Sequence, residues 1–352
     1  MPLMSLTRLE LTDFRNHASM SLRPEAPFIA LFGANGAGKT NVLEAISLLV
    51  PGRGLRRAAL EEMPRCGGKG GFTITAEIDD VTLGTGVEAH APARRKVRIN
   101  GANATINGLA EWLSVVWLTP SMDRLFTEGA ATRRRFLDRL VLALEPMHAR
   151  NSSRFEKAMQ QRNRLLTDYA AADPVWLDAL EAQMAESGAA IGDARQRTMA
   201  GLISQLADVS AYPFAVPDIE LAFDTPRSEP EMRSLWRRDR RRDAGAGRTL
   251  IGPHRADLVV HNRANNHAAD RCSTGEQKAL LLSLILAHAA LVASQRGAPP
   301  ILLLDEVAAH LDPARRAALF ARLAETGAQV WMTGTEPALF DGIGPIAELV
   351  GI

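Results

Sequence analysis

The first fifty residues alternate between polar and apolar positions in ways that predict strands and one helix. Apolar and polar residues alternate over Ser5–Asp13, which predicts a strand with one buried face. A second strand is expected over His17–Leu22. Phe28–Phe32 is apolar throughout, as in a strand that is covered on both faces. A glycine-rich loop follows, and Asn41–Val50 then has the pattern of a helix. Strand, glycine loop and helix follow one another in this order in nucleotide-binding units.

The middle of the chain changes from β to helical patterns. Glycine- and valine-rich segments between Phe72 and Asn107 predict β structure with tight turns. From Ala131 to Val209 helix formers dominate. One predicted helix has an apolar face with residues at three- and four-residue intervals. These are Phe155, Met159, the aliphatic stem of Arg162, Leu166 and Tyr169.

A long helix is expected to begin at Asp173 and Pro174, which are a capping residue and a first-turn proline. Running unbroken to Val209, it would be about 54 Å long. Gly188 and Gly192 are expected to interrupt it. We therefore predict a helical hairpin or small bundle inserted into an α/β domain.

The α/β pattern resumes near the C-terminal end. We expect a helix over Lys278–Ser294, a strand over Ile301–Leu304, a helix over Pro313–Glu325 and a strand over Gln329–Thr333. The apolar stretch Ala279–Ala293 is shorter than the roughly 18–20 residues that span a bilayer, which favours a buried helix. No structure is assigned to the basic segment from Arg233 to Gly247. The expected domains are residues 1–130, an inserted helical arm over 131–210, and residues 211–352.

Composition narrows the class of protein. Of 352 residues, 46% are hydrophobic and 23% are charged, which excludes disorder throughout. The 41 basic and 40 acidic residues leave a net charge of +1, so affinity for an acidic partner would come from local patches. The distant Cys66 and Cys272 form no disulfide framework, and Met1–Asp13 lacks the apolar core of a signal peptide. We expect a cytoplasmic protein without membrane segments.

One motif predicts a nucleotide site. Residues 33–40 read Gly-Ala-Asn-Gly-Ala-Gly-Lys-Thr and match GxxxxGK[ST] at every fixed position. Glycines let backbone N–H groups surround phosphate oxygens, and the next helix offers its positive end. Lys39 would reach the β- and γ-phosphates, and the Thr40 hydroxyl would bind Mg²⁺. The alternative, a glycine turn that binds nothing, fits the flanking strand and helix less well.

Two further segments carry candidate chemistry. Ile301–Leu304 leads into Asp305 and Glu306, where a P-loop ATPase holds Mg²⁺ and activates water. Upstream, Ser273 and Gly275 open the long apolar helix and form a second candidate anion site. Because the first loop already serves one nucleotide, this second site would contact nucleotide held by another subunit. An ordinary helix cap is the alternative, but the position of the turn, one helix ahead of the Asp305–Glu306 strand, favours the anion site.

Together these segments resemble the signature, Walker B and D-loop motifs of ABC-type ATPases in their SMC/Rad-like branch. The motifs are Ser-x-Gly-Glu-Gln from Ser273, Leu-Leu-Leu-Asp-Glu to Glu306, and His310-Leu311-Asp312. Further segments are similar to the RecF family within that branch, and they run in family order over almost the whole chain. These segments are Leu9–His17, Arg133–Asp138, Gln161–Leu166 and Thr249–Leu258.

The resemblance implies an α/β ATPase head with a mixed sheet and a short helical arm. It also implies that ATP drives head-to-head homodimerisation and that slow hydrolysis acts as a switch. Family members bind duplex DNA near single-strand gaps during replication and repair after DNA damage, in the SOS response. They work with the mediators RecR and RecO to load the RecA recombinase, so the expected location is the nucleoid.

The resemblance also assigns roles to residues of this sequence. The implied ATP-binding residues are Arg15, Gly33, Ala34, Asn35, Gly36, Ala37, Gly38, Lys39, Thr40 and Asn41. The implied cross-subunit signature is Ser273, Thr274, Gly275, Glu276 and Gln277, with Asp312 in the D-loop. Lys39 and Glu306 are the implied catalytic residues, and Thr40 and Asp305 the Mg²⁺ ligands.

The chain departs from the usual pattern at two places. The stretch Thr119–Asp123 lacks the glutamine that ABC ATPases place between lobes. Thr333 and Thr335 stand where transporters carry a switch histidine. A hydroxyl can orient water but cannot take up its proton at neutral pH. Slow turnover is therefore expected, with Glu306 alone activating water.

Four basic clusters are candidates for DNA contact, since cations that neutralise phosphates give sequence-independent affinity. They lie at Arg53–Arg57, Arg94–Arg98, Arg133–Arg135 and Arg233–Arg242, and the last holds six arginines against one aspartate. The residues chosen as DNA-binding candidates are Arg94, Arg95, Arg133, Arg134, Arg237, Arg238 and Arg241. A solvated helix face is the alternative for any one cluster.

Three other functions are compatible with a phosphate loop but fit this sequence less well. A transporter's ATPase subunit is disfavoured by the missing glutamine and histidine, and by the arginine-rich helical insert. A scaffold linking chromosomes is disfavoured by the short arm, and a kinase leaves the Ser273–Gln277 turn unexplained.

A zinc site is also disfavoured. The candidate ligands are His254, His261, His267 and Cys272, and their spacings match no familiar zinc site.

Overall fold

The computed structural model describes residues 5–207, 214–222 and 228–352, and these residues form two compact units. The head unit comprises Met1–Asp123, Gln205–Val216 and Thr274–Ile352, and the arm unit comprises Arg124–Ser204 and Pro217–Ser273. The expected arm over 131–210 differs from this division, because residues 217–273 also belong to the arm unit.

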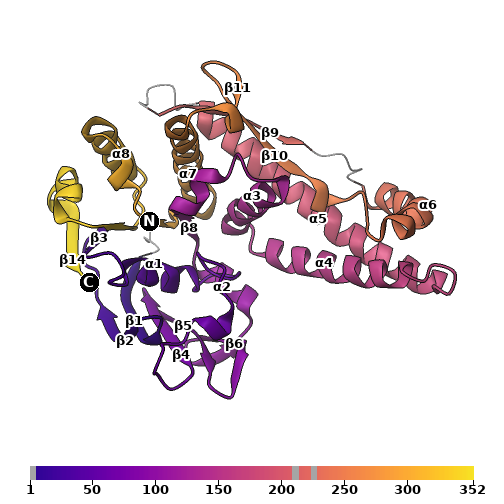
Figure 1. Cartoon of the computed structure of the whole chain (residues 1–352), viewed down its shortest axis with the longest axis horizontal. Coiled ribbons are helices and arrows are strands. Elements are labelled where there is room, and N and C mark those ends of the chain that lie inside the picture. Colours follow the sequence, from indigo (N-terminus) through magenta and orange to yellow (C-terminus); the bar gives the residue numbers. More distant parts are fainter. Residues whose placement is uncertain (1–4, 208–213, 223–227) are drawn as a thin grey trace. The chain divides into compact units, whose positions relative to one another are not determined.

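An antiparallel sheet forms one part of the head unit (Figure 1). Its strands, in spatial order, are β2 (His17–Leu22), β1 (Leu6–Phe14), β4 (Phe72–Ile78), β5 (Val81–Glu88), β6 (Ala91–Ile99) and β7 (Ala102–Ala104). The predicted strands at the start of the chain and the β structure between Phe72 and Asn107 are confirmed.

A parallel sheet forms the second part of the head unit. Its strands, in spatial order, are β14 (Ala347–Gly351), β3 (Phe28–Phe32), β13 (Val330–Gly334), β12 (Ile301–Leu304) and β8 (Val115–Leu118). Because the strands are parallel, the segments that follow β3, β12 and β13 leave the sheet at the same edge. Residues distant in the sequence are thereby brought together.

The helices of the head unit are α1 (Lys39–Ser47), α2 (Leu109–Trp112), α7 (Thr274–Arg296) and α8 (Pro313–Glu325). Short 3₁₀ turns lie at Leu60–Glu62, Ile106–Gly108, Pro120–Arg124, Ala308–His310 and Pro337–Ile346. The core joins both sheets to α1, with Leu9, Leu43 and Trp331 fully buried in one cluster. This packing fixes α1 against the strands that carry the candidate site.

The long apolar helix α7 has 23 residues, and its most apolar window has a mean hydropathy of 1.6. By length and composition it could cross a membrane, but 78% of that window is buried within the chain's own fold. Such burial is typical of a core helix, as the sequence predicted. The helix is longer than the apolar stretch because it includes polar residues at both ends, from Thr274 to Arg296.

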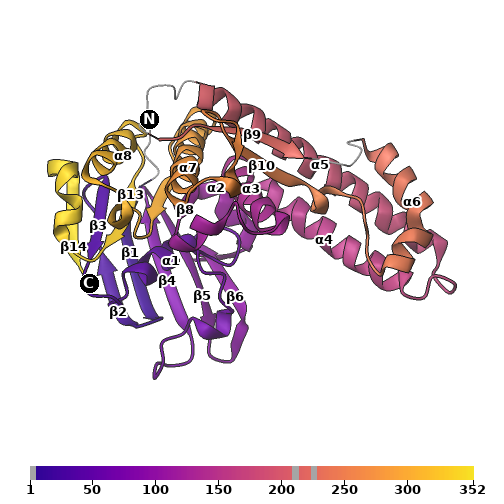
Figure 2. The ribbon, with the colours of Figure 1, turned by 45° about the horizontal axis from the view of Figure 1, so that its top comes forward.

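The arm unit is mainly helical (Figure 2). Its helices are α3 (Ala130–Leu144), α4 (Met147–Leu166), α5 (Pro174–Ala207) and α6 (Glu229–Ala246), with a 3₁₀ turn at Pro253–Arg255 and another at Ala269–Arg271. A small antiparallel sheet has the order β11 (His267–Ala268), β10 (Asp257–Asn262) and β9 (Pro217–Ala222). The prediction of a helical insert is confirmed, whereas α6 was not predicted.

Two details of the arm helices differ from expectation. Glycines do not interrupt α5, which runs unbroken over 34 residues. A Cβ on Gly188 would lie 3.4–3.5 Å from Met232, Phe155 and Pro253, so this position lets other segments pack closely against the helix. Tertiary packing therefore outweighs the weak helix propensity of glycine. Tyr169 lies beyond the end of α4 and is exposed, so it does not continue the buried face.

Candidate functional site

The phosphate loop between β3 and α1 is held by the β1–β2 turn. The Asn16 side-chain amide donates to the carbonyl oxygen of Ala37 at 2.7 Å, and Asn41 donates to Asn16 Oδ1 at 2.6 Å. Gly38 has φ = 116°, and a Cβ there would lie 2.6 Å from the side chains of Asn16 and His17. Glycine is therefore required at this position by both backbone conformation and space.

The loop surrounds a pocket of about 170 Å³. Its lining residues are Asn35, Gly36, Gly38, Lys39, Thr40, Asn41, Arg56 and Glu306. Lys39 is buried, and its Nζ donates to the carbonyl oxygens of Gly33 at 2.7 Å and Ala34 at 2.9 Å. This buried ammonium is held by two carbonyls of the loop, so it is placed to meet a phosphate that enters the loop.

Three side chains converge where β12 and β13 end. Asp305 Oδ1 accepts hydrogen bonds from the hydroxyls of Thr40 and Thr333, both at 2.8 Å. Thr333 Oγ1 in turn accepts from the backbone N–H of Glu306 at 2.9 Å. Glu306 has φ = 53°, a left-handed conformation uncommon for residues other than glycine. Its backbone hydrogen bond helps to hold this strained residue beside the pocket.

Burial raises the pKa of Asp305 above its ordinary value, and the nearby Glu306 carboxylate adds to the shift. The hydroxyls of Thr333 and Thr40 and the charge of Arg56 oppose it. A cation bound beside this carboxylate would oppose the effect of burial, because an opposite charge stabilises the ionised form. Thr40 and Asp305 supply adjacent hard oxygen ligands beside the phosphate pocket, which suits Mg²⁺ bound through one carboxylate and substrate phosphates.

Arg15 and Arg56 share one buried carboxylate. Arg15 donates to both oxygens of Glu44 at 2.7 Å, and Arg56 donates to Glu44 at 3.0 Å. Arg15 was expected to bind ATP, but it does not appear among the residues that line the pocket, whereas Arg56 does. The sequence placed Arg56 only in a basic cluster, because nothing local indicated its pairing with α1.

The signature segment is exposed at the start of α7. Ser273, Thr274 and Gly275 are exposed, and a Cβ on Gly275 would meet no atom within 4 Å. Glu276 is half-buried and Gln277 is buried. None of these residues is among those that line the phosphate pocket. The first residues of this segment are therefore exposed at the surface.

The remaining predicted residues have separate positions. Asp312 caps α8, since its Oδ1 accepts from the backbone N–H of Arg315 at 2.9 Å. Thr335 is exposed beyond β13, whereas Thr333 is buried and engaged with Asp305 and Glu306. Thr333 is therefore not free to orient water, and of the two threonines only Thr335 has an exposed side chain.

The structure separates the candidate DNA-binding arginines. Arg95 donates to the carbonyl oxygens of Gly52 at 2.8 Å and of Leu48, and burial lowers its pKa to about 10. Arg133 forms a two-point ion pair with Asp257, and Arg134 donates to the carbonyl of Ala256 at 2.8 Å. These three guanidiniums hold the fold together. Exposed guanidiniums belong to Arg94, Arg237, Arg238 and Arg241.

The family profile described as the RecF/RecN/SMC N-terminal domain matches residues 5–349. The DNA replication and repair protein RecF of Rhizobium johnstonii is 51% identical over 360 residues, covering 98% of this chain and 96% of the relative. The chain belongs to the RecF family. RecF of Brucella suis biovar 1 is 48% identical, covering 99% of this chain and 94% of the relative.

Solved structures agree on the fold of this RecF-family chain. A structure of the recombination mediator protein RecF with ATP in the RecFOR pathway has a TM-score of 0.83 at 22% identity, covering 96% of this chain and 93% of that chain. An Smc head domain with an extended coiled coil from Pyrococcus furiosus has a TM-score of 0.56 at 17% identity, covering 100% of this chain and 93% of that chain. The expected SMC-type head fold is confirmed.

Proposed function

We propose that this RecF-family chain is an ATP- and Mg²⁺-dependent DNA-binding protein of replication and recombinational repair. One observation carries the proposal: Thr40, Asp305 and Thr333 form a hydrogen-bonded set at the phosphate pocket, with Glu306 in its lining. These residues come from three separate segments and supply what a P-loop ATPase needs. The names of the relatives support the repair role.

In the proposed mechanism, backbone N–H groups of the loop and the Lys39 ammonium bind the β- and γ-phosphates. Bound Mg²⁺ would supply charge neutralisation on the phosphates, with Thr40 and Asp305 as its protein ligands. Glu306 accepts a proton from the attacking water, because it is the carboxylate in the pocket lining. Thr333 is engaged with Asp305 and Glu306, and Thr335 offers only a hydroxyl, which cannot take up a proton from water at neutral pH. Hydrolysis is therefore slow and acts as a switch.

The second half of the nucleotide site comes from another copy of the chain. Ser273 and Gly275, exposed at the start of α7, contact the γ-phosphate held by the partner. Two copies therefore close only when ATP is bound, and hydrolysis separates them. Asp312 and Thr335 contribute to the same closed interface.

The closed dimer binds duplex DNA near single-strand gaps and, with RecR and RecO, assists loading of the RecA recombinase. The relation to the mediators is supported by the solved RecF described as a recombination mediator in the RecFOR pathway. The protein then acts in the cytoplasm, at the nucleoid.

Light scattering after size-exclusion chromatography, with Mg²⁺ and a non-hydrolysable ATP analogue, tests the dimer. Wild-type protein is expected to double in mass only with nucleotide. Ser273→Arg is expected to remain monomeric while it still binds nucleotide, because a bulky cation blocks the cross-subunit contact. Ser153→Arg, at an exposed serine on α4, is the matched control and should dimerise. A Ser273→Arg variant that dimerises normally excludes the cross-subunit site.

A further inference from the structure

Helix α6 has one deeply buried side. Trp236 is 1% exposed, and its indole N–H donates to the carbonyl of Ile251 at 2.7 Å. Met232 is buried with it, and Phe155 of α4 lies against the Trp236 ring, with 6.1 Å between ring centroids. Both ends of the helix are also fixed. Ser228 caps the first turn, and Gly247 takes the left-handed conformation that ends it.

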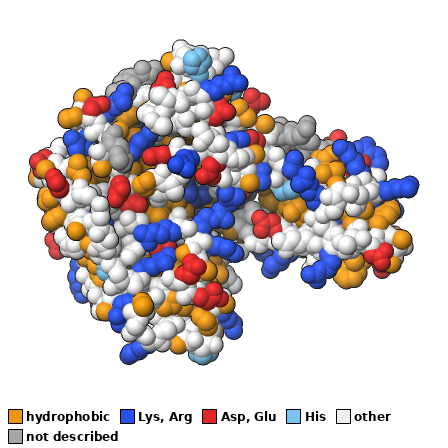
Figure 3. All heavy atoms as spheres, viewed as in Figure 1, with side chains coloured by type: hydrophobic (Ala, Val, Ile, Leu, Met, Phe, Trp, Pro, Cys, Tyr) orange, Lys and Arg blue, Asp and Glu red, His pale blue; other side chains and the backbone are white. Residues whose placement is uncertain are grey.

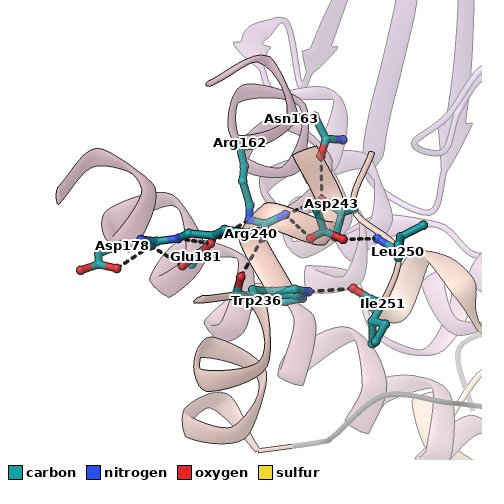
Figure 4. Close-up of polar contacts among 10 residues, drawn as sticks. Arg162, Asn163, Asp178, Glu181, Trp236, Arg240, Asp243, Leu250 and Ile251 are labelled. Atoms are coloured by element: carbon teal, nitrogen blue, oxygen red, sulfur yellow. Dashed lines mark hydrogen bonds and ion pairs between the residues drawn. The ribbon is translucent and has the colours of Figure 1, made fainter. Parts of the chain in front are cut away.

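Beneath α6 lies a network of buried charges (Figure 4). Arg162 of α4 donates to Glu181 at 2.9 Å, to Asp243 at 2.7 Å and to the carbonyl of Trp236 at 2.9 Å. Arg240 of α6 donates to Glu181 at 2.6 Å and to Asp178 at 2.5 Å. Helix α6 is therefore held against α4 and α5 by satisfied ion pairs, which give its orientation specificity.

The other side of α6 carries exposed arginines and forms what we call the α6 arginine face, made of Arg233, Arg237, Arg238, Arg241 and Arg242. At about 100° per residue these positions cover roughly half of the helix circumference. Figure 3 shows Lys and Arg side chains gathered over α6. The first turn also holds the carboxylates of Glu229 and Glu231, so the positive charge is densest over residues 237–242.

These arginines are weakly engaged within the chain. Arg237 and Arg238 remain 70% and 71% exposed despite contacts with Asp178 at 3.6 Å and the neighbouring Asp239 at 3.0 Å. For Arg233, Arg241 and Arg242 the described residues provide no carboxylate within 4.0 Å. In contrast, the guanidiniums of Arg95, Arg133 and Arg134 form hydrogen bonds or ion pairs with other residues of the fold. The chain thus holds an anchored cationic face whose charges are exposed and only weakly paired within the chain.

We propose that the α6 arginine face binds the phosphate backbone of duplex DNA. The inference rests on the proposed function and adds to it the surface of contact. From Arg233 to Arg241 the helix rises about 12 Å. Duplex DNA carries about seven phosphates over that length when both strands are counted, and about three to four on one strand, at about 3.4 Å per strand. Three or more guanidiniums can therefore meet phosphates at once.

Two features favour the duplex backbone over other acidic partners. Trp236, the aromatic residue within the cluster, is buried and bonded, so it offers no platform for stacking unpaired bases. The five positions of the face are all arginines, so contacts there are made by guanidiniums and not by the apolar anchors of a protein interface, although Val175 and Trp176 of α5 are exposed elsewhere on the arm unit. Contacts made only by guanidiniums give affinity that is independent of sequence and sensitive to salt.

The test measures DNA affinity against salt for a triple variant, Arg237→Gln, Arg241→Gln and Arg242→Gln, by fluorescence anisotropy of labelled gapped duplex with Mg-ATP. The slope of log affinity against log salt should fall by about 3, since each lost phosphate contact removes about 0.9. Affinity near 0.1 M salt should fall at least tenfold. The same three positions changed to Lys should recover most of the slope, because the charge is kept.

The matched control removes the same charge from α4 through Arg150→Gln, Lys157→Gln and Arg164→Gln, all at exposed positions of the arm unit. It should keep the wild-type slope. A triple α6 variant with the wild-type slope overturns the inference and assigns the face to a protein partner or to solvent. Failure of the wild type to bind DNA is a different result, because it removes the proposed function itself.

Discussion

The hydroxyl of Thr40 donates a hydrogen bond of 2.8 Å to Asp305, although 265 positions separate the two residues in the sequence. Thr40 lies in the first turn of α1, and Asp305 follows β12. Their contact requires the parallel sheet to bring the ends of β3 and β12 to the same edge. The proposed nucleotide and Mg²⁺ site therefore depends on the assembled sheet, and no single segment contains it.

Replacing Lys39 with alanine should abolish ATP binding. The buried ammonium is the cation of the phosphate loop, and its loss also leaves the carbonyls of Gly33 and Ala34 without their donor. Isothermal titration with ATP and Mg²⁺ should show an affinity at least a hundredfold weaker. Lys69→Ala, at an exposed lysine, is the control and should bind as the wild type does. Equal affinity of the two variants would contradict the role of Lys39.

Thr333→Val should slow hydrolysis while ATP affinity changes little. The change keeps the shape but removes the hydroxyl that bonds Asp305 and the N–H of Glu306. A lost buried hydrogen bond costs about 1–3 kcal/mol, so we expect turnover at least about fivefold lower in a phosphate-release assay. Thr335→Val, which removes an exposed hydroxyl, measures the separate switch role. Unchanged turnover in Thr333→Val would show that Glu306 needs no such support.

Asp138 should stabilise the arm unit in a manner that depends on pH. Burial alone would raise its pKa, but hydrogen bonds from His148 and Arg195 outweigh burial and hold the pKa at about 2. Because the folded pKa lies below the unfolded one, the contribution is complete above about pH 4 and is lost as pH falls through about 2. It amounts to about 2 kcal/mol at neutral pH.

Thermal unfolding at several pH values tests this linkage. At neutral pH Asp138→Asn should lower the melting temperature of the arm unit, and the difference from the wild type should shrink as pH falls below about 4. Asp168→Asn, at an exposed aspartate after α4, provides the comparison and should show no such trend. A difference that is constant with pH would mean that Asp138 acts through packing alone.

Arg162→Leu should destabilise the arm unit severely. The guanidinium is fully buried, and its removal leaves Glu181 and Asp243 with one partner fewer. Breaking a buried ion pair from one side costs about 3–5 kcal/mol. Arg154→Leu, whose ion pair with Glu186 is partly exposed, should cost less than about 1 kcal/mol. Denaturant unfolding of both variants measures the loss in free energy of unfolding. An equal loss in the two variants would contradict the stabilising role of the Arg162 network.

Local signals predicted much of the fold. Asp312 and Pro313 mark the start of α8, and Asp173 and Pro174 mark that of α5, because capping and first-turn proline act within a few residues. Helix α6 was not predicted, because its buried side is not wholly apolar. Two of its buried positions are Arg240 and Asp243, so charged pairs occupy places where apolar residues would show periodicity.

For the candidate site, the sequence predicted the motifs but not the partners of the arginines. The loop from Gly33 to Thr40 and the Asp305–Glu306 pair are local motifs, and the fold brings residues of both to one pocket. The partners of each arginine are not local, however. Arg95 and Arg133 look like surface charge in the sequence, yet they bond carbonyls and a carboxylate brought in by folding. Thr333 likewise gained its two partners only through the parallel pairing of β12 with β13.

The most direct test of the account is anisotropy of labelled gapped duplex DNA with wild-type protein and Glu306→Gln, each with and without Mg-ATP. The wild type should bind tightly only with Mg-ATP and should release DNA as ATP is consumed. Glu306→Gln should bind with the same requirement but release DNA at least tenfold more slowly, because its side chain cannot accept the proton from water. DNA binding that is indifferent to ATP in both proteins would contradict the account.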